Sequence, residues 1–73
     1  MIEMTVLIDS VDKIRDFNRL VMQFDCECDI VSGAYVIDAK SIMGLFSLDV
    51  SNPVTLIVHD DDADLSEISK YEV

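Results

Sequence analysis

The chain has 73 residues, of which 51% are hydrophobic, and its 15 acidic and 5 basic residues give a formal net charge of −10. A chain of this length forms a single domain, residues 1–73, and buries only about 60% of the surface that its unfolded form exposes. The negative charge argues against binding to nucleic acids or membrane surfaces, because it repels phosphate backbones and anionic lipids. No apolar run reaches the roughly 20 residues of a membrane helix, and no basic segment precedes an apolar one at the N-terminus, so we expect a soluble, cytoplasmic protein.

The N-terminal third predicts a strand followed by an amphipathic helix. Residues 4–8, MTVLI, are apolar and β-branched, which is typical of a strand. In the stretch DSVDKIRDFNRLVMQF, Asp9 and Ser10 can cap a helix, and Asp12 suits the positive end of the helix dipole. Apolar residues then recur at steps of three and four, which predicts one buried helix face: Val11, Ile14, Phe17, Val21 and Phe24.

The two cysteines flank Glu27, so an extended backbone would place both thiols on one face. Cys26 and Cys28 are interpreted as small buried side chains. A metal site would need further ligands, and the single histidine, His59, lies far away in the sequence. We therefore expect no metal and no cofactor.

The rest of the chain predicts three strands and two helices. The stretch CDIVSGAYVIDA is typical of a hairpin that turns at Ser32 and Gly33. Residues 41–48 predict a short helix, Asn52-Pro53 breaks the chain, and residues 54–59, VTLIVH, form the fourth strand. From Ala63 there is room for a last helix of about three turns. It would bury Leu65, Ile68 and Tyr71.

The resulting order is strand, helix, strand, strand, helix, strand, helix. This alternation predicts an α+β fold in which helices cover one face of a four-stranded antiparallel sheet. The acidic run Asp60 to Asp64 could suggest calcium ligands, but consecutive carboxylates without an ordered loop indicate a solvated turn.

The segment DAKSIMGLFSLDV carries a specific resemblance. KSIMG followed by the apolar LFSL resembles the region around the regulatory serine of HPr, the histidine-containing phosphocarrier of the bacterial sugar phosphotransferase system. The similarity extends without gaps from about Phe24 to His59. It implies the HPr-like open-faced sandwich, with a shortened last helix here.

The resemblance fails at the phosphorylated loop of the family. HPr proteins carry phosphate on a histidine in a Gly-x-His-x-Arg-Pro loop, where a helix N-terminus and an arginine stabilise the charge. The equivalent IDSVDKIRDF has no His, Gly or Pro, and Asp9 and Asp12 would repel a phosphoryl group. His59 is expected at the opposite end of the sheet, next to Asp60, so it is interpreted as an exposed strand-terminal residue. We expect no histidine phosphocarrier activity and no catalytic residue.

Ser41 has two interpretations, and the sequence leaves both open. It can cap the short helix, which contributes about 1 kcal/mol. It also matches the serine that HPr kinase phosphorylates in some HPr proteins. A phosphate there adds about −1.5 to −2 charges at the favourable end of a helix.

Three apolar residues after Ser41 match the surface with which HPr proteins dock onto partners: Ile42, Met43 and Phe46. On a short surface helix some of these side chains face solvent, and an apolar patch with a polar rim is typical of an interaction site. The alternative is that they pack inward, as we expect Leu45 and Leu48 to do.

Taken together, the residues and the resemblance predict a regulatory or binding module related to the phosphotransferase system, and not an enzyme. Its partners would be proteins of that system or HPr kinase. The alternatives are a phosphocarrier component with another acceptor and a structural homodimer. Because the last helix is short, part of the inner face of the sheet would lack a cover, and we expect a weak dimer that tightens as salt screens the charge.

Overall fold

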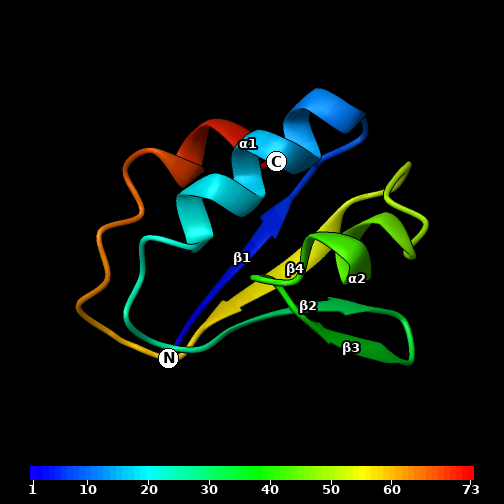
Figure 1. The fold of residues 1–73 in the computed structure, drawn as a ribbon. Coiled ribbons are helices and arrows are strands. Elements are labelled where there is room, and N and C mark those ends of the chain that lie inside the picture. The colour runs from blue at the N-terminus through cyan, green and yellow to red at the C-terminus, as the bar shows by residue number, and fades with distance from the viewer.

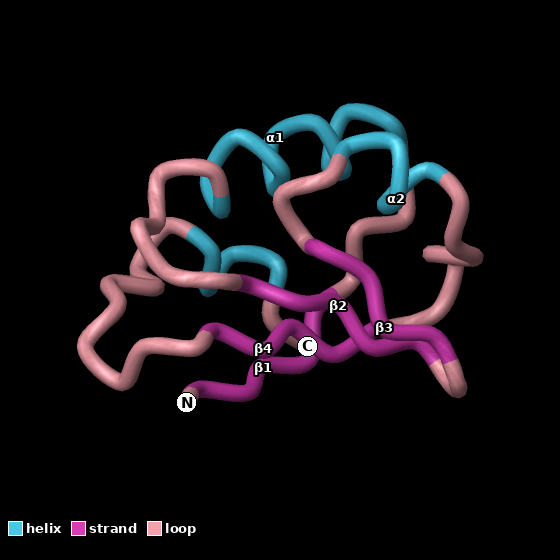
Figure 2. Tube along the Cα trace, turned by 60° about the horizontal axis from the view of Figure 1, so that its bottom comes forward, coloured by secondary structure: helices cyan, strands magenta, loops and turns pink.

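The computed structural model describes all 73 residues and arranges four strands and the helices in two layers (Figures 1 and 2). The elements are β1 (Ile2–Val6), α1 (Val11–Val21), β2 (Cys28–Ser32), β3 (Tyr35–Asp38), α2 (Ile42–Phe46), β4 (Val54–Val58) and the 3-10 helix η1 (Ile68–Tyr71). The strands lie in the order β1-β4-β2-β3, and every neighbouring pair is antiparallel. The predicted α+β fold is therefore confirmed. The longest helix, α1, has 11 residues, and no helix has the length and apolar character needed to cross a membrane.

Helix α1 begins where the sequence predicted. Ser10 is extended, and its Oγ accepts a hydrogen bond from the backbone N–H of Lys13 at 3.2 Å, which satisfies one of the free donors of the first turn. The helix ends at Val21, so it is shorter than predicted, and Phe24 lies beyond it and is only partly buried. Val11 is 53% exposed, so its predicted place on the buried face was wrong.

The hairpin between β2 and β3 has a two-residue loop. Ser32 pairs with Tyr35, so the loop consists of Gly33 and Ala34, one residue later than predicted. Gly33 has a φ of +59°, and no residue other than glycine has a positive φ. A positive φ at the first loop residue followed by a negative one is typical of a type II′ turn, for which glycine is the residue without steric cost.

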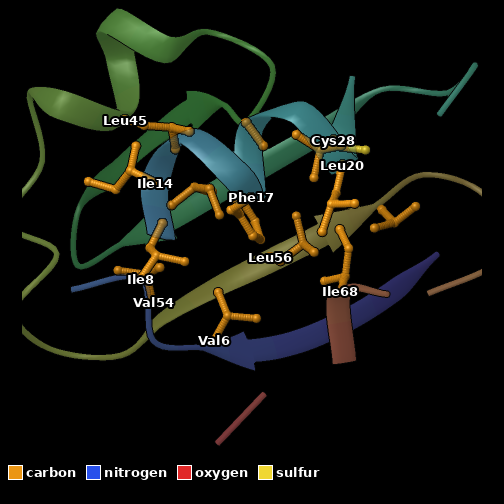
Figure 3. Packing of buried hydrophobic residues seen from close by; sticks show 14 residues of the cluster. Val6, Ile8, Ile14, Phe17, Leu20, Cys28, Leu45, Val54, Leu56 and Ile68 are labelled. Atoms are coloured by element: carbon orange, nitrogen blue, oxygen red, sulfur yellow. The ribbon is translucent and has the colours of Figure 1, made fainter. Parts of the chain in front are cut away.

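The core lies between the sheet and α1 (Figure 3). In β4 the buried residues alternate along the strand, as expected when one face of a strand is covered. Phe17 of α1 is fully buried, and Figure 3 shows it above Leu56 of β4. The core consists of 14 buried residues: Val6, Ile8, Ile14, Phe17, Leu20, Val21, Cys28, Ile30, Ala39, Leu45, Val54, Leu56, Val58 and Ile68.

The predicted last helix is present but shorter than the three turns expected, because only the four residues of η1 are helical. Before them, the carboxylate of Asp60 accepts from the N–H of Asp62 at 2.9 Å, and that of Asp64 accepts from the N–H of Ser66 at 3.0 Å. Such local bonds offer the backbone an alternative to a helix. Ile68 is nevertheless buried at 1% exposure.

After η1 the chain runs along the outer edge of β1. Glu72 forms an antiparallel bridge with Val6, the N–H of Leu7 donates to Tyr71 O at 2.9 Å, and the N–H of Val73 donates to Thr5 O at 3.0 Å. The inner face of β4 is buried throughout, Cys28 and Ile30 of β2 are buried, and Ile2 and Met4 of β1 are partly buried, so the large uncovered area expected from a short helix is absent. The weak dimer stays a prediction, but an uncovered inner face of the sheet no longer supports it.

Candidate functional site

Helix α2 is capped by the serine that the sequence singled out. Ser41 is exposed and extended, and its Oγ accepts from the N–H of Gly44 at 3.2 Å. The capping prediction is confirmed. A Cβ on Gly44 would lie 3.3 Å from Ser41 Oγ and 3.4 Å from Ile37 Cδ1, so glycine lets the cap and β3 approach the helix closely.

The segment before Ser41 is held by α1. Asn18 donates from Nδ2 to the carbonyl of Ala39 at 3.3 Å and to that of Lys40 at 3.0 Å. The ammonium of Lys40 in turn donates to Phe24 O at 2.6 Å. Sequence reasoning missed both contacts, since a polar side chain gives no sign of which distant carbonyl it will meet. These bonds set the position of the start of α2 relative to α1.

The predicted docking residues divide into exposed and half-buried side chains. Met43 is 76% exposed and Phe46 is 41% exposed, whereas Ile42 is partly buried against the core. Leu45 is fully buried, as predicted, and Leu48 is partly buried. The outer side of α2 therefore presents two large apolar side chains beside an exposed serine, which we call the α2 patch (Ser41, Ile42, Met43 and Phe46).

The loop between β1 and α1, residues 7–10, holds no histidine. Ile8 is fully buried there, and Asp9 accepts a hydrogen bond from Lys13 Nζ at 2.9 Å. This bond lowers the pKa of the Asp9 carboxyl and occupies the ammonium of Lys13. Arg15 is exposed and forms no ion pair. The loop thus offers no histidine as an acceptor for a phosphoryl group.

His59 lies at the other end of the sheet. Val58, the residue before His59, pairs with Ile2, which is the first residue of β1. The loop to α1 follows Val6, which is the last residue of β1. The Nε2 atom of His59 lies 2.8 Å from a carboxylate oxygen of Asp29, and its side chain is 39% exposed. The predicted strand-terminal position is confirmed, and the carboxylate neighbour was not foreseen.

The two cysteines are both free. Cys28 is buried, and burial raises the pKa of its thiol to about 12, so it is a poor nucleophile and metal ligand. Cys26 is partly buried. No group of three or more His, Cys, Asp or Glu residues is arranged to hold a metal ion, and this includes the acidic run Asp60 to Asp64.

Comparison with known proteins gives a match among solved structures. No family model matches the sequence, and no curated protein matches it either. Among solved structures, the crystal structure of HPr-C-His from Thermoanaerobacter tengcongensis is similar, with a TM-score of 0.76 and 30% sequence identity. The match covers 96% of this chain and 84% of that chain. The two chains are therefore similar in fold and in sequence over nearly the whole domain.

Proposed function

Because this chain belongs to the HPr family, we propose that it is a protein related to the phosphotransferase system that binds protein partners through the α2 patch and does not carry phosphate on a histidine. Phosphorylation of Ser41 would modulate this binding. We assign no catalytic residue to the chain. The observation that carries the proposal is the exposed α2 patch on a domain whose first loop lacks the family's phosphohistidine.

The docking role is supported by the burial pattern of α2. Helix α2 has five residues and buries Leu45 completely. Met43 and Phe46 of the same helix remain exposed. Apolar side chains of this size stabilise an interface when a partner covers them, at roughly 25 cal/mol per Å² of apolar surface. The hydrogen bonds from Asn18 hold the start of the helix in place, so little order must be gained on binding.

The regulatory role of Ser41 is supported by its surroundings. Its Oγ is exposed, and the first turn of α2 contains no acidic residue that would repel a phosphate. The N–H of Gly44, which now donates to the Oγ, can donate to a phosphate oxygen instead. Phosphorylation would then change the charge of the α2 patch without unfolding the helix.

Two other serines provide an internal comparison. Ser47 Oγ donates to Gly44 O at 2.6 Å, and Ser51 Oγ donates to a carboxylate oxygen of Asp49 at 2.6 Å. Their hydroxyls are engaged, and neither follows a lysine or precedes the apolar run. A kinase that reads the HPr site should therefore modify Ser41 alone.

The test uses two phosphoryl donors. HPr kinase with ATP should place one phosphate on Ser41 and none on Ser47 or Ser51, as located by mass spectrometry, and Ser41→Ala should remain unmodified. Enzyme I with phosphoenolpyruvate should leave the chain unmodified, with an authentic HPr as positive control in both reactions. A phosphate on His59 would favour the alternative of a phosphocarrier with a different acceptor. An unmodified Ser41 would reduce that residue to a helix cap.

The docking role has its own test. A double variant, Met43→Ala with Phe46→Ala, should weaken binding to HPr kinase or enzyme I at least about tenfold, since two large side chains at an interface centre are lost. Met22→Ala is the matched control, because Met22 is 56% exposed on α1 and lies outside the patch. Equal binding by both variants would contradict the docking role.

A further inference from the structure

The two edges of the sheet differ in what covers them. The edge at β1 is covered by the C-terminal residues, through the bridge between Val6 and Glu72 and two further backbone hydrogen bonds. The edge at β3 has no such neighbour, and β3 is the last strand in the order. In Figure 1 it is the outermost strand of the sheet, opposite β1.

The open edge at β3 offers unpaired backbone groups. The N–H of Ala39 donates to Cys28 O, and Ser32 and Tyr35 flank the two-residue turn. Hydrogen-bonded and non-hydrogen-bonded pairs alternate along an antiparallel ladder. The N–H groups of Val36 and Asp38 therefore point away from β2. No turn, loop or cap bond uses either N–H group or the carbonyl of Val36. Val36 is also 63% exposed. A further strand can therefore pair with β3 without breaking an existing bond.

A hollow next to this edge can receive a side chain. It has a volume of about 440 Å³ and is lined by residues 32–35, Ile37 and residues 47–49. Tyr35 and Ile37 are two residues apart in β3, so both lie on its helix-facing side. Leu48 borders the hollow from the segment after α2. An apolar residue opposite Tyr35 on an added strand would point into it.

The charge of the chain decides which occupant fits. A second hollow, at the other end of β3, has four acidic residues in its lining: Asp25, Glu27, Asp29 and Asp38. Its one cation, Lys40, is already bound to the carbonyl of Phe24. A second copy would bring another formal charge of −10 to this edge, whereas a basic segment would be attracted.

We propose that β3 is a docking edge for an extended, basic and apolar segment of a protein partner, which adds to the sheet as a fifth strand. In an antiparallel register a basic residue lies opposite Asp38 and an apolar residue lies opposite Tyr35. Backbone bonds to Val36 provide the pairing, and the hollow and the acidic end provide the selectivity. This surface is separate from the α2 patch and does not depend on its proposed role.

The experiment uses a blocked peptide, Lys-Lys-Val-Thr-Leu-Thr, which places its second lysine opposite Asp38 and its leucine opposite Tyr35. NMR titration should shift the amide signals of residues 35–38 and 47–49. It should also slow hydrogen exchange at the N–H groups of Val36 and Asp38. A peptide with glutamates in place of the lysines should bind at least about tenfold more weakly, because like charges then face each other. N-methylation of the first threonine removes the donor to Val36 O, keeps the charge and should abolish the shifts.

Two variants of the chain separate a specific edge from general attraction. Asp38→Asn keeps the oxygen that accepts from the N–H of Lys40 at 2.9 Å and removes the charge, so binding should weaken several-fold while the turn is kept. Asp12→Asn removes the same charge from α1 and should leave binding unchanged. Equal weakening by both variants, equal binding of the N-methylated peptide, or shifts confined to the acidic loop at residues 60–64 would overturn the proposal. So would a second copy that occupies β3 and excludes the peptide.

Discussion

The two edges of this sheet solve the same problem in different ways. A sheet edge exposes a row of backbone donors and acceptors to which other strands can add. At β1 the chain covers the edge with its own last residues, and at β3 it leaves the edge open beside two hollows. The closed edge is joined to the core through Ile68, whereas the open edge ends in exposed Tyr35 and Val36. Stability is thus concentrated on one side of the sheet, and the surface available to partners on the other.

A small group of contacts holds the C-terminal residues against α1, and we call it the clasp (Asp16, Phe17, Arg19, Lys70 and Tyr71). The carboxylate of Asp16 on α1 accepts from Arg19 at 2.7 Å, from Lys70 at 2.8 Å and from the hydroxyl of Tyr71. The ring of Tyr71 also meets that of Phe17 edge to face, with centroids 6.0 Å apart. Burial and the bond to Asp16 raise the pKa of the Tyr71 hydroxyl to about 12, so it remains a donor well above the pH at which an ordinary tyrosine ionises.

The largest effect is expected from opening the closed edge. Ile68→Ala should reduce the free energy of unfolding by about 2–5 kcal/mol, because Ile68 is fully buried and a cavity remains. Small domains have only about 5–15 kcal/mol of stability in all. Val36→Ala at the open edge should change it by less than about 0.5 kcal/mol. Urea unfolding of the two variants measures the difference, and similar losses would contradict the asymmetry.

A smaller effect is expected from the charge of the clasp. Hydrogen bonds from Lys70, Tyr71 and Arg19 hold the pKa of the Asp16 carboxyl well below its usual range. A lowered pKa in the folded state contributes stability above the unfolded pKa, near 3.9, and this contribution is lost as the pH falls below it. Asp16→Asn should therefore lower the Tm at pH 7, and the difference from the parent chain should shrink below about pH 4.

The control for this pH dependence is Asp25→Asn, which removes an exposed carboxylate that lies outside the helices and forms no ion pair. Thermal unfolding followed by circular dichroism between neutral and acidic pH gives the curves. A difference between Asp16→Asn and the parent chain that does not depend on pH would show that packing, and not ionisation, holds the clasp.

On the open side, removing the cap of α2 should lower the free energy of unfolding less than Ile68→Ala does and more than a change at Val36 does. Ser41→Ala should cost about 1 kcal/mol, because the N–H of Gly44 loses its acceptor. Ser41→Asp restores a capping oxygen and should unfold at nearly the same urea concentration as the parent chain. If alanine is tolerated as well as aspartate, the cap contributes nothing to the fold and Ser41 is free for another role.

The smallest effect on stability is expected at Val36, where the effect on association should be clear. Val36→Lys places a charge on the open edge and should change the free energy of unfolding by less than about 0.5 kcal/mol. A lysine on this edge also repels a basic segment, so the peptide Lys-Lys-Val-Thr-Leu-Thr should bind the variant at least about tenfold more weakly than the parent chain. NMR titration of both chains measures the difference, and equal binding would contradict the open docking edge. The weak dimer that we expect at high salt would form away from β3, so sedimentation should show it equally in both chains.

The caps and the hairpin turn were predicted well, because each depends on residues that are neighbours in the sequence. Ser10 and Ser41 are caps because each stands one residue before a helix and can reach a free N–H in the first turn. Gly33 lies in a turn because glycine, which has no Cβ, adopts a φ of +59° without steric cost. One error lies at an element end, at exposed Val11, where neither periodicity nor capping specifies which way the side chain turns. The other is the last helix, which forms only the four residues of η1 instead of three turns.

The sequence by itself determined the order of the elements, the alternation of the core and the caps of both helices, because periodicity and capping act within a few residues. Only the tertiary structure decided which edge of the sheet is closed, since that depends on contacts such as Tyr71 with Asp16, which are 55 residues apart. The same holds for Asn18, which reaches the start of α2, and for the exposure of Met43 and Phe46. Such contacts form when distant segments bury apolar surface together, and no spacing along the chain encodes which polar atoms then meet.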